Sequence, residues 1–174
     1  GVRCITALAT SGGELLVANG SATNPAADWQ LDLLERNVSG SIWRIDLATG
    51  GSRQVAAGLA FPSGLAVDEK GVVYSEAWKH RLCRLGAGSG EPQILLSDLP
   101  GYPGRLSRSV DGYWLAVFAP RSQLVEFVLR ERGYRRRMVA EVPRPFWVAP
   151  KLRSGRSFYE PLQGGGVKHL GLLK

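Results

Sequence analysis

The chain has 174 residues, enough for one domain or a substantial part of one, and its 22 glycines and 10 prolines indicate many turns. It contains no run of 18 apolar residues, so a membrane-spanning helix is excluded. The formal net charge of +7 is compatible with nucleic-acid binding, but no recognised nucleic-acid motif accompanies it, and this partner is disfavoured.

The first unit, residues 1–57, reads as four short strands. Two strands within residues 3–18 are joined by a small polar turn, and strict alternation of apolar and polar residues returns from residue 41. Residues 21–40 interrupt the strands with a predicted short helix that begins near Asp28, whose carboxylate is expected to cap the exposed amides. We expect this insertion to lie at one end of the molecule as a candidate lid.

Two further units follow at a period of about forty residues. Residues 58–97 form the clearest unit, and residues 98–142 repeat it. Pro62 of the former corresponds to Pro103 of the latter. The repeat predicts an all-β fold, a β-propeller whose four-stranded antiparallel blades stack on one another. In the third blade the outer strands are expected up to residue 129 and at residues 134–142, which places the arginine-rich segment at an exposed edge.

Residues 143–174 are predicted to be irregular and to lead to a missing blade, with a strand expected at residues 167–173. Three blades make half of a six-bladed ring. Either missing blades or a second copy of the chain must therefore close the ring.

Cys4 and Cys83 lie in strand-like apolar sequence and are expected to be buried free thiols instead of a disulfide. The cellular compartment is not defined by these residues. A cytoplasmic location is favoured only weakly, and a targeting segment ahead of Gly1 stays an open alternative.

Three segments, residues 39–50, 58–82 and 98–116, resemble the strictosidine synthase-like family, within the six-bladed propellers that include paraoxonases and gluconolactonases. In that wider group, oxygen-bearing side chains after the blade prolines help to bind a central metal. This chain has Ser63 where relatives often have Asn, and Gly104-Arg105 where they have Asp-Asn. Because calcium needs several oxygen ligands, the resemblance predicts no metal and no other cofactor here.

The blade alignment places Glu76 and Trp78 at the same end of the ring as Arg105. A bidentate pair between Glu76 and Arg105 is expected, and the alternative interpretation is a structural ion pair that plugs the channel. The candidate ligand-binding residues are Arg105, Glu76, Ser63, Trp78 and Asn19, and no catalytic residue is assigned.

Four other polar and aromatic residues are not assigned a role in ligand binding. His80 is expected in an exposed hairpin, and neither it nor His169 has a nucleophile at a recognisable spacing. Tyr102 and Trp114 are expected to be packing residues.

The resemblance implies that the parent protein binds a small organic molecule at the top of the ring. If it is an enzyme, a metal-independent lyase or condensing enzyme is expected, although the family's catalytic glutamate belongs to a last blade that this chain lacks. The isolated chain is therefore expected to be inactive. The alternatives are a calcium-dependent lactonase or esterase and a non-catalytic interaction scaffold.

Overall fold

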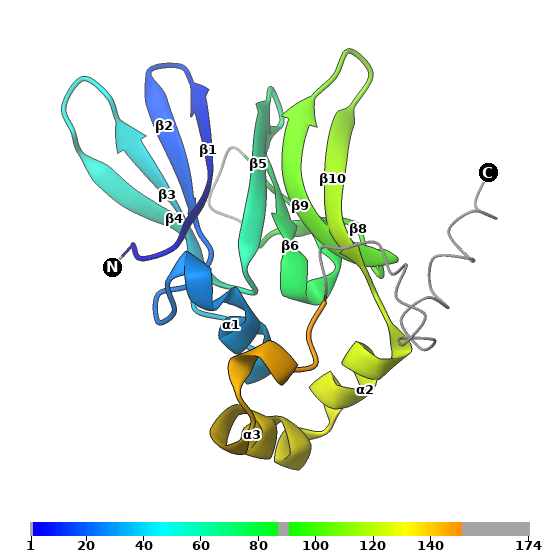
Figure 1. The fold of residues 1–174 in the computed structure, drawn as a ribbon. Helices are drawn as coiled ribbons and strands as arrows, with labels where there is room; N and C mark the ends of the chain where they lie inside the picture. Colours follow the sequence, from blue (N-terminus) through cyan, green and yellow to red (C-terminus); the bar gives the residue numbers. More distant parts are fainter. Residues whose placement is uncertain (1, 87–90, 151–174) are drawn as a thin grey trace.

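The computed structural model describes residues 2–86 and 91–150, which form three antiparallel sheets with helices gathered at one end (Figure 1). The first sheet has the order β1 (Ile5–Ser11), β2 (Glu14–Asn19), β3 (Gly40–Asp46) and β4 (Ser52–Leu59). The second has the order β5 (Pro62–Asp68), β6 (Gly71–Glu76), β7 (Arg81–Leu85) and β8 (Gln93–Leu96). The third pairs β9 (Gly101–Arg108) with β10 (Tyr113–Pro120). Each sheet is a meander in which neighbouring strands follow one another in sequence, as in propeller blades.

The blades meet along their first strands, β1, β5 and β9, which lie side by side. Thr6 donates a hydrogen bond to the carbonyl of Pro62 over 2.5 Å, and Ser63 donates one to the carbonyl of Pro103 over 2.8 Å. Gly64 has no space for a side chain, because a Cβ atom would collide with the carbonyl of Gly104. The repeated proline-containing motif therefore sets the close spacing between blades, and the predicted partial β-propeller is confirmed.

Apolar side chains fill the spaces between successive blades. The core between the first and second blades contains Leu16, Ala18, Ile42, Leu59, Leu65, Val72, Tyr74, Cys83 and Leu85. A second core, between the second and third blades, contains Ala66, Val73, Leu82 and Leu106. Both predicted free cysteines are buried. Stacking thus buries both faces of the second blade and one face of each of the other two, as the repeat requires.

The predicted insertion helix is present as η1 (Ala26–Asp28) followed by α1 (Trp29–Glu35). The expected cap is wrong, since the side chain of Asp28 makes no hydrogen bond to the first turn and instead pairs with Arg144. α1 lies across the end of the blades near α3 and the helices' shared apolar core.

The strands expected after residue 121 are wrong, because this segment forms α2 (Gln123–Arg130) and α3 (Arg132–Glu141), followed by η3 (Arg144–Phe146). Ser122 caps α2 by accepting a hydrogen bond from the amide of Val125 over 3.3 Å. Val125 and Val128 are buried at helical spacing. The third blade therefore has two strands in the described part of the chain, and the strand expected at residues 167–173 lies outside it.

Candidate functional site

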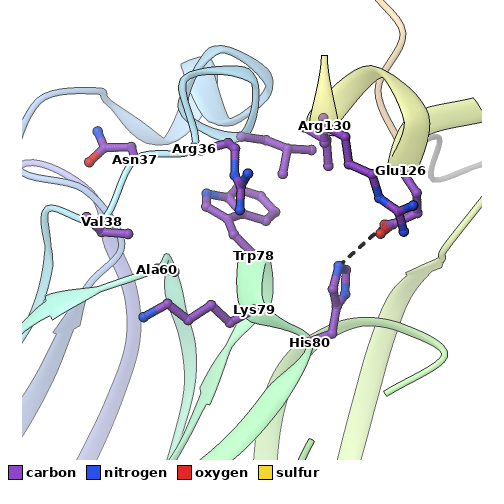
Figure 2. Close-up of a pocket in the computed structure, with 11 residues that line it drawn as sticks. Arg36, Asn37, Val38, Ala60, Trp78, Lys79, His80, Glu126 and Arg130 are labelled. Carbon is purple, nitrogen blue, oxygen red and sulfur yellow. Dashed lines mark ion pairs between the residues drawn. The ribbon is translucent and has the colours of Figure 1, made fainter. Parts of the chain in front are cut away.

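A pocket of about 240 Å³ lies between the second blade and the helices (Figure 2). The turn η2 (Ala77–Lys79) joins β6 to β7 beside the pocket, while the end of α1 and the last turns of α2 supply other walls. The lining side chains are Leu33, Arg36, Asn37, Val38, Ala60, Trp78, Lys79, His80, Glu126, Leu129 and Arg130. Three segments that are far apart in sequence thus meet at one site.

Glu76 directly precedes the η2 turn and holds it in place. Its carboxylate is fully buried, accepts a hydrogen bond from the amide of Ala60 over 2.9 Å and forms an ion pair with Arg81. The ammonium group of Lys79 lies 3.3 Å from the same carboxylate. The expected pair between Glu76 and Arg105 is therefore wrong, because Arg81 stands directly opposite Glu76 in the β6–β7 register.

Trp78 forms an apolar wall of the pocket and is held from two sides. Its ring stacks on Phe61 with centroids 4.4 Å apart, and its indole N–H donates a hydrogen bond to Asp32 over 2.7 Å. Asp32 is fully buried in α1, so this bond fastens the η2 turn to the insertion helix. Trp29 of the same helix lies 6.4 Å from Trp78, as centroids are measured. These contacts fix the orientation of the Trp78 ring.

His80 and Glu126 close another side of the pocket, where Figure 2 marks their contact. The exposed hairpin expected for His80 is wrong, since only 8% of its surface is accessible. Its Nδ1 atom is 3.0 Å from the carbonyl oxygen of Gly101, so Nδ1–H donates, and Nε2 faces Glu126 Oε1 at 3.5 Å. That distance lies beyond the usual range of an N–H···O hydrogen bond, and Glu126 Oε1 accepts no hydrogen bond within the described residues.

Glu126 is also held by Arg121, whose guanidinium donates to the other carboxylate oxygen over 2.9 Å. Interaction with His80 first, and then with Arg121, outweighs burial and lowers the pKa of Glu126 to about 2. Glu126 is therefore an ionised carboxylate over the whole physiological range.

The sequence-predicted residues are only partly brought together. Trp78 lines the pocket, and Glu76 lies beneath it as an anchor. Ser63 bonds across to the third blade, and Asn19 is fully buried, where its side-chain oxygen accepts from the amides of residues 3 and 4. Arg105 is exposed on β9 and forms no ion pair with the described carboxylates. Ligand binding by these five residues stays a prediction.

Sequence reasoning missed four charged residues of the pocket, Arg36, Lys79, Glu126 and Arg130. Glu126 lies in the segment that was interpreted as strand and Arg130 directly follows it, and strand alternation gives no reason to place the two at one pocket. Arg36 directly follows the predicted helix, and its position just before the next strand was the available signal. Trp114 was also misjudged as a packing residue, since it is 73% exposed, whereas Tyr102 is fully buried as expected.

Within residues 2–86 and 91–150, no group of three metal-ligating His, Cys, Asp or Glu side chains comes together. No helix in the same part of the chain is long and apolar enough to cross a membrane.

The blades and the helical end define a partial β-propeller. No protein-family model matches the sequence. The chain is 30% identical over 132 residues to strictosidine synthase-like 13 of Arabidopsis thaliana, a match that covers 72% of this chain and 32% of that protein. It is 26% identical over 167 residues to the adipocyte plasma membrane-associated protein of Danio rerio, covering 80% of this chain and 40% of that protein. The chain is therefore similar in sequence to strictosidine synthase-like proteins, and it spans about a third to two fifths of the length of these relatives.

Among solved structures, a luciferin-regenerating enzyme aligns with a TM-score of 0.47 and 19% sequence identity. The alignment covers 63% of this chain and 37% of that enzyme.

Proposed function

We propose that the propeller to which this chain contributes binds a small organic molecule in the pocket between η2, α1 and α2. The observation that carries the proposal is the pocket's aromatic wall, in which Trp78 is fixed by Phe61 and Asp32. A preformed concave site with an aromatic wall and a few polar groups is the usual form of a small-molecule site. The cavity of about 240 Å³ suits a compact ligand.

The two carboxylates at the site favour metal-independent chemistry. Glu76 is compensated by Arg81 and Glu126 by Arg121, so both acids already have cationic partners. A dication would also meet the neighbouring side chains of Lys79 and Arg130. If the whole protein is an enzyme, this arrangement disfavours a calcium-dependent lactonase or esterase at this pocket, and a metal-independent lyase or condensing enzyme, which the sequence resemblance implies, is the proposal.

A blocking substitution at the pocket rim tests binding. Val38 lines the pocket and is 50% exposed, so Val38→Trp fills space without entering the buried core. Ligand-observed NMR with a library of neutral, anionic and cationic fragments should detect binders to the unmodified protein and lose most of them in this variant. Val110→Trp is the matched control, because Val110 is 99% exposed in the β9–β10 turn. Binding that survives Val38→Trp unchanged would place the ligand elsewhere.

A further inference from the structure

We infer that the pocket selects a compact organic anion, a molecule with an apolar body and a carboxylate or phosphate group. The inference rests on the proposed function and names the ligand class of the same pocket. Three observations carry it: the imbalance of charge among the lining side chains, two arginines that have no carboxylate partner within the described residues, and the apolar surface between these arginines.

The lining residues carry more positive than negative charge. Arg36, Lys79 and Arg130 are cations and Glu126 is the carboxylate among the lining residues, which gives a net charge of +2 with His80 counted as neutral. Lys79 lies 3.3 Å from the buried carboxylate of Glu76, but Arg81 pairs with that carboxylate as well, so the positive excess persists. Glu126 does not neutralise this excess, because Arg121, which is outside the lining set, already binds it. A cavity with low-dielectric walls and an excess of one sign concentrates ligands of the opposite sign.

Arg36 and Arg130 reach the pocket from different helices. Arg36 ends α1 in a left-handed conformation with φ of 54°, and Arg130 is the last residue of α2. Neither forms an ion pair with a carboxylate in residues 2–86 and 91–150. Figure 2 shows the two guanidinium side chains beside the pocket, with Lys79 on its other side. As far as the described part of the chain goes, their planar donor groups can therefore bind a carboxylate or phosphate in a bidentate manner.

Beyond the effect of burial, the positive charge of Arg36 contributes to a lower pKa of the neighbouring Arg135. Burial first, and then repulsion from Arg36, Arg132 and Arg136, lowers the pKa of Arg135. Arg135 also donates a hydrogen bond to the carbonyl of Leu34 at the end of α1, which fixes it close to this rim. An anion bound between the arginines would relieve that repulsion.

The remaining surface accommodates the apolar part of the ligand. Trp78, Leu33 and Leu129 present an aromatic face and two aliphatic side chains to the cavity. The volume is below the roughly 300–1,000 Å³ of pockets for drug-sized ligands, which favours a molecule of one ring.

Four probes of similar size test the inference: benzoate, phenyl phosphate, benzyl alcohol and benzylamine. On the full chain at low salt, both anions should bind roughly tenfold or more tightly than the alcohol, since one charge-assisted hydrogen bond contributes that much. Arg36→Glu with Arg130→Glu should abolish this preference, and the milder Arg130→Gln should reduce it. Arg53→Glu is the matched control, because Arg53 is exposed on β4, outside the pocket. The ratio of benzoate to phenyl phosphate affinity separates a carboxylate from a phosphate ligand.

The outcomes separate the two proposals. Equal binding of benzoate and benzyl alcohol, both blocked by Val38→Trp, would overturn anion selection and leave the pocket's binding function in place. If Arg36 and Arg130 serve only to complement the helix ends, the double variant will lower the melting temperature without changing selectivity, which also overturns the inference. Failure of all four probes, together with an empty fragment screen, would overturn both proposals.

Discussion

Glu76 shows at the scale of one residue why a buried acid near a pocket need not be part of the chemistry. Its carboxylate has no accessible surface and is surrounded by the amide of Ala60 and by Arg81 and Lys79. These donors fix the end of β6 and the start of η2, which carries Trp78 into the pocket. The glutamate therefore acts on the site through the backbone that it holds.

Replacing Glu76 with Gln should lower the free energy of unfolding by about 2–3 kcal/mol, because Arg81 loses its buried counter-charge. Arg81 retains 25% side-chain exposure, which keeps the cost below that of a fully buried pair. Urea denaturation with an unchanged m-value is the measurement. Glu14→Gln is the control, since its pair with Arg44 is partly exposed and should contribute about 0–1 kcal/mol. Equal losses in the two variants would contradict the anchoring role.

The same residue shows what sequence can predict of the site. The strand pattern placed Glu76 and Trp78 at the correct end of the blade, because strand direction follows from the repeat. The predicted partner of Glu76 was incorrect. Arg105 lies one blade away, whereas Arg81 stands opposite Glu76 in the β6–β7 pair, directly after a tight turn. Register at the ends of a hairpin depends on the turn, and the 3-10 turn at residues 77–79 was not identifiable from periodicity.

At the scale of elements, the repeat predicted the eight strands of the first two blades and the pair β9–β10 correctly. It failed in α2, where Leu124, Val125, Val128 and Leu129 fit a helical stripe that had been interpreted as strand alternation. The segment was interpreted as strand because a third four-stranded blade was expected to need two more strands there. Ser122, a favourable N-cap residue, was the local signal for a helix.

The contact that joins α2 to the second blade should be sensitive to acid. Glu126 has a folded-state pKa of about 2, below its ordinary value of 4.5. A depressed carboxyl pKa stabilises the fold above the ordinary value, and this stability is lost as pH falls from about 4.5 to about 2. Tyr102, Arg121 and His80 are the titratable or charged groups that influence Glu126.

Glu126→Gln should therefore have a flatter dependence of unfolding free energy on pH across that window than the unmodified protein. Asp68 contributes in the same window, since hydrogen bonds from Tyr113 and Arg84 outweigh burial and lower its pKa to about 2. Asp68→Asn is consequently the matched control, and its effect should add to that of Glu126→Gln because the two sites share no partners. Parallel pH profiles for Glu126→Gln and the unmodified protein would contradict the assignment.

At the scale of the whole molecule, the partial ring has two faces that no other element of residues 2–86 and 91–150 covers. Ala7 of β1 packs toward the second blade, so its neighbour Leu8, which is 59% exposed, points to the opposite side. In β10, Tyr113 and Leu115 pack toward the second blade, and Trp114 between them is 73% exposed on the far side. These are the faces on which further blades would stack.

The open faces predict association. Because the Leu8 face and the Trp114 face lie at opposite ends of the partial ring, contact between them joins two copies head to tail, and two such contacts close a ring. Sedimentation velocity should show the sedimentation coefficient of the chain rising with concentration, and Leu8→Asp or Trp114→Asp should each suppress the rise by placing a charge at the contact. Val110→Asp, at the exposed β9–β10 turn, should leave it unchanged. A chain that stays monomeric at every concentration would show that the faces do not pair with each other, and that blades from elsewhere must cover them if the ring is to close.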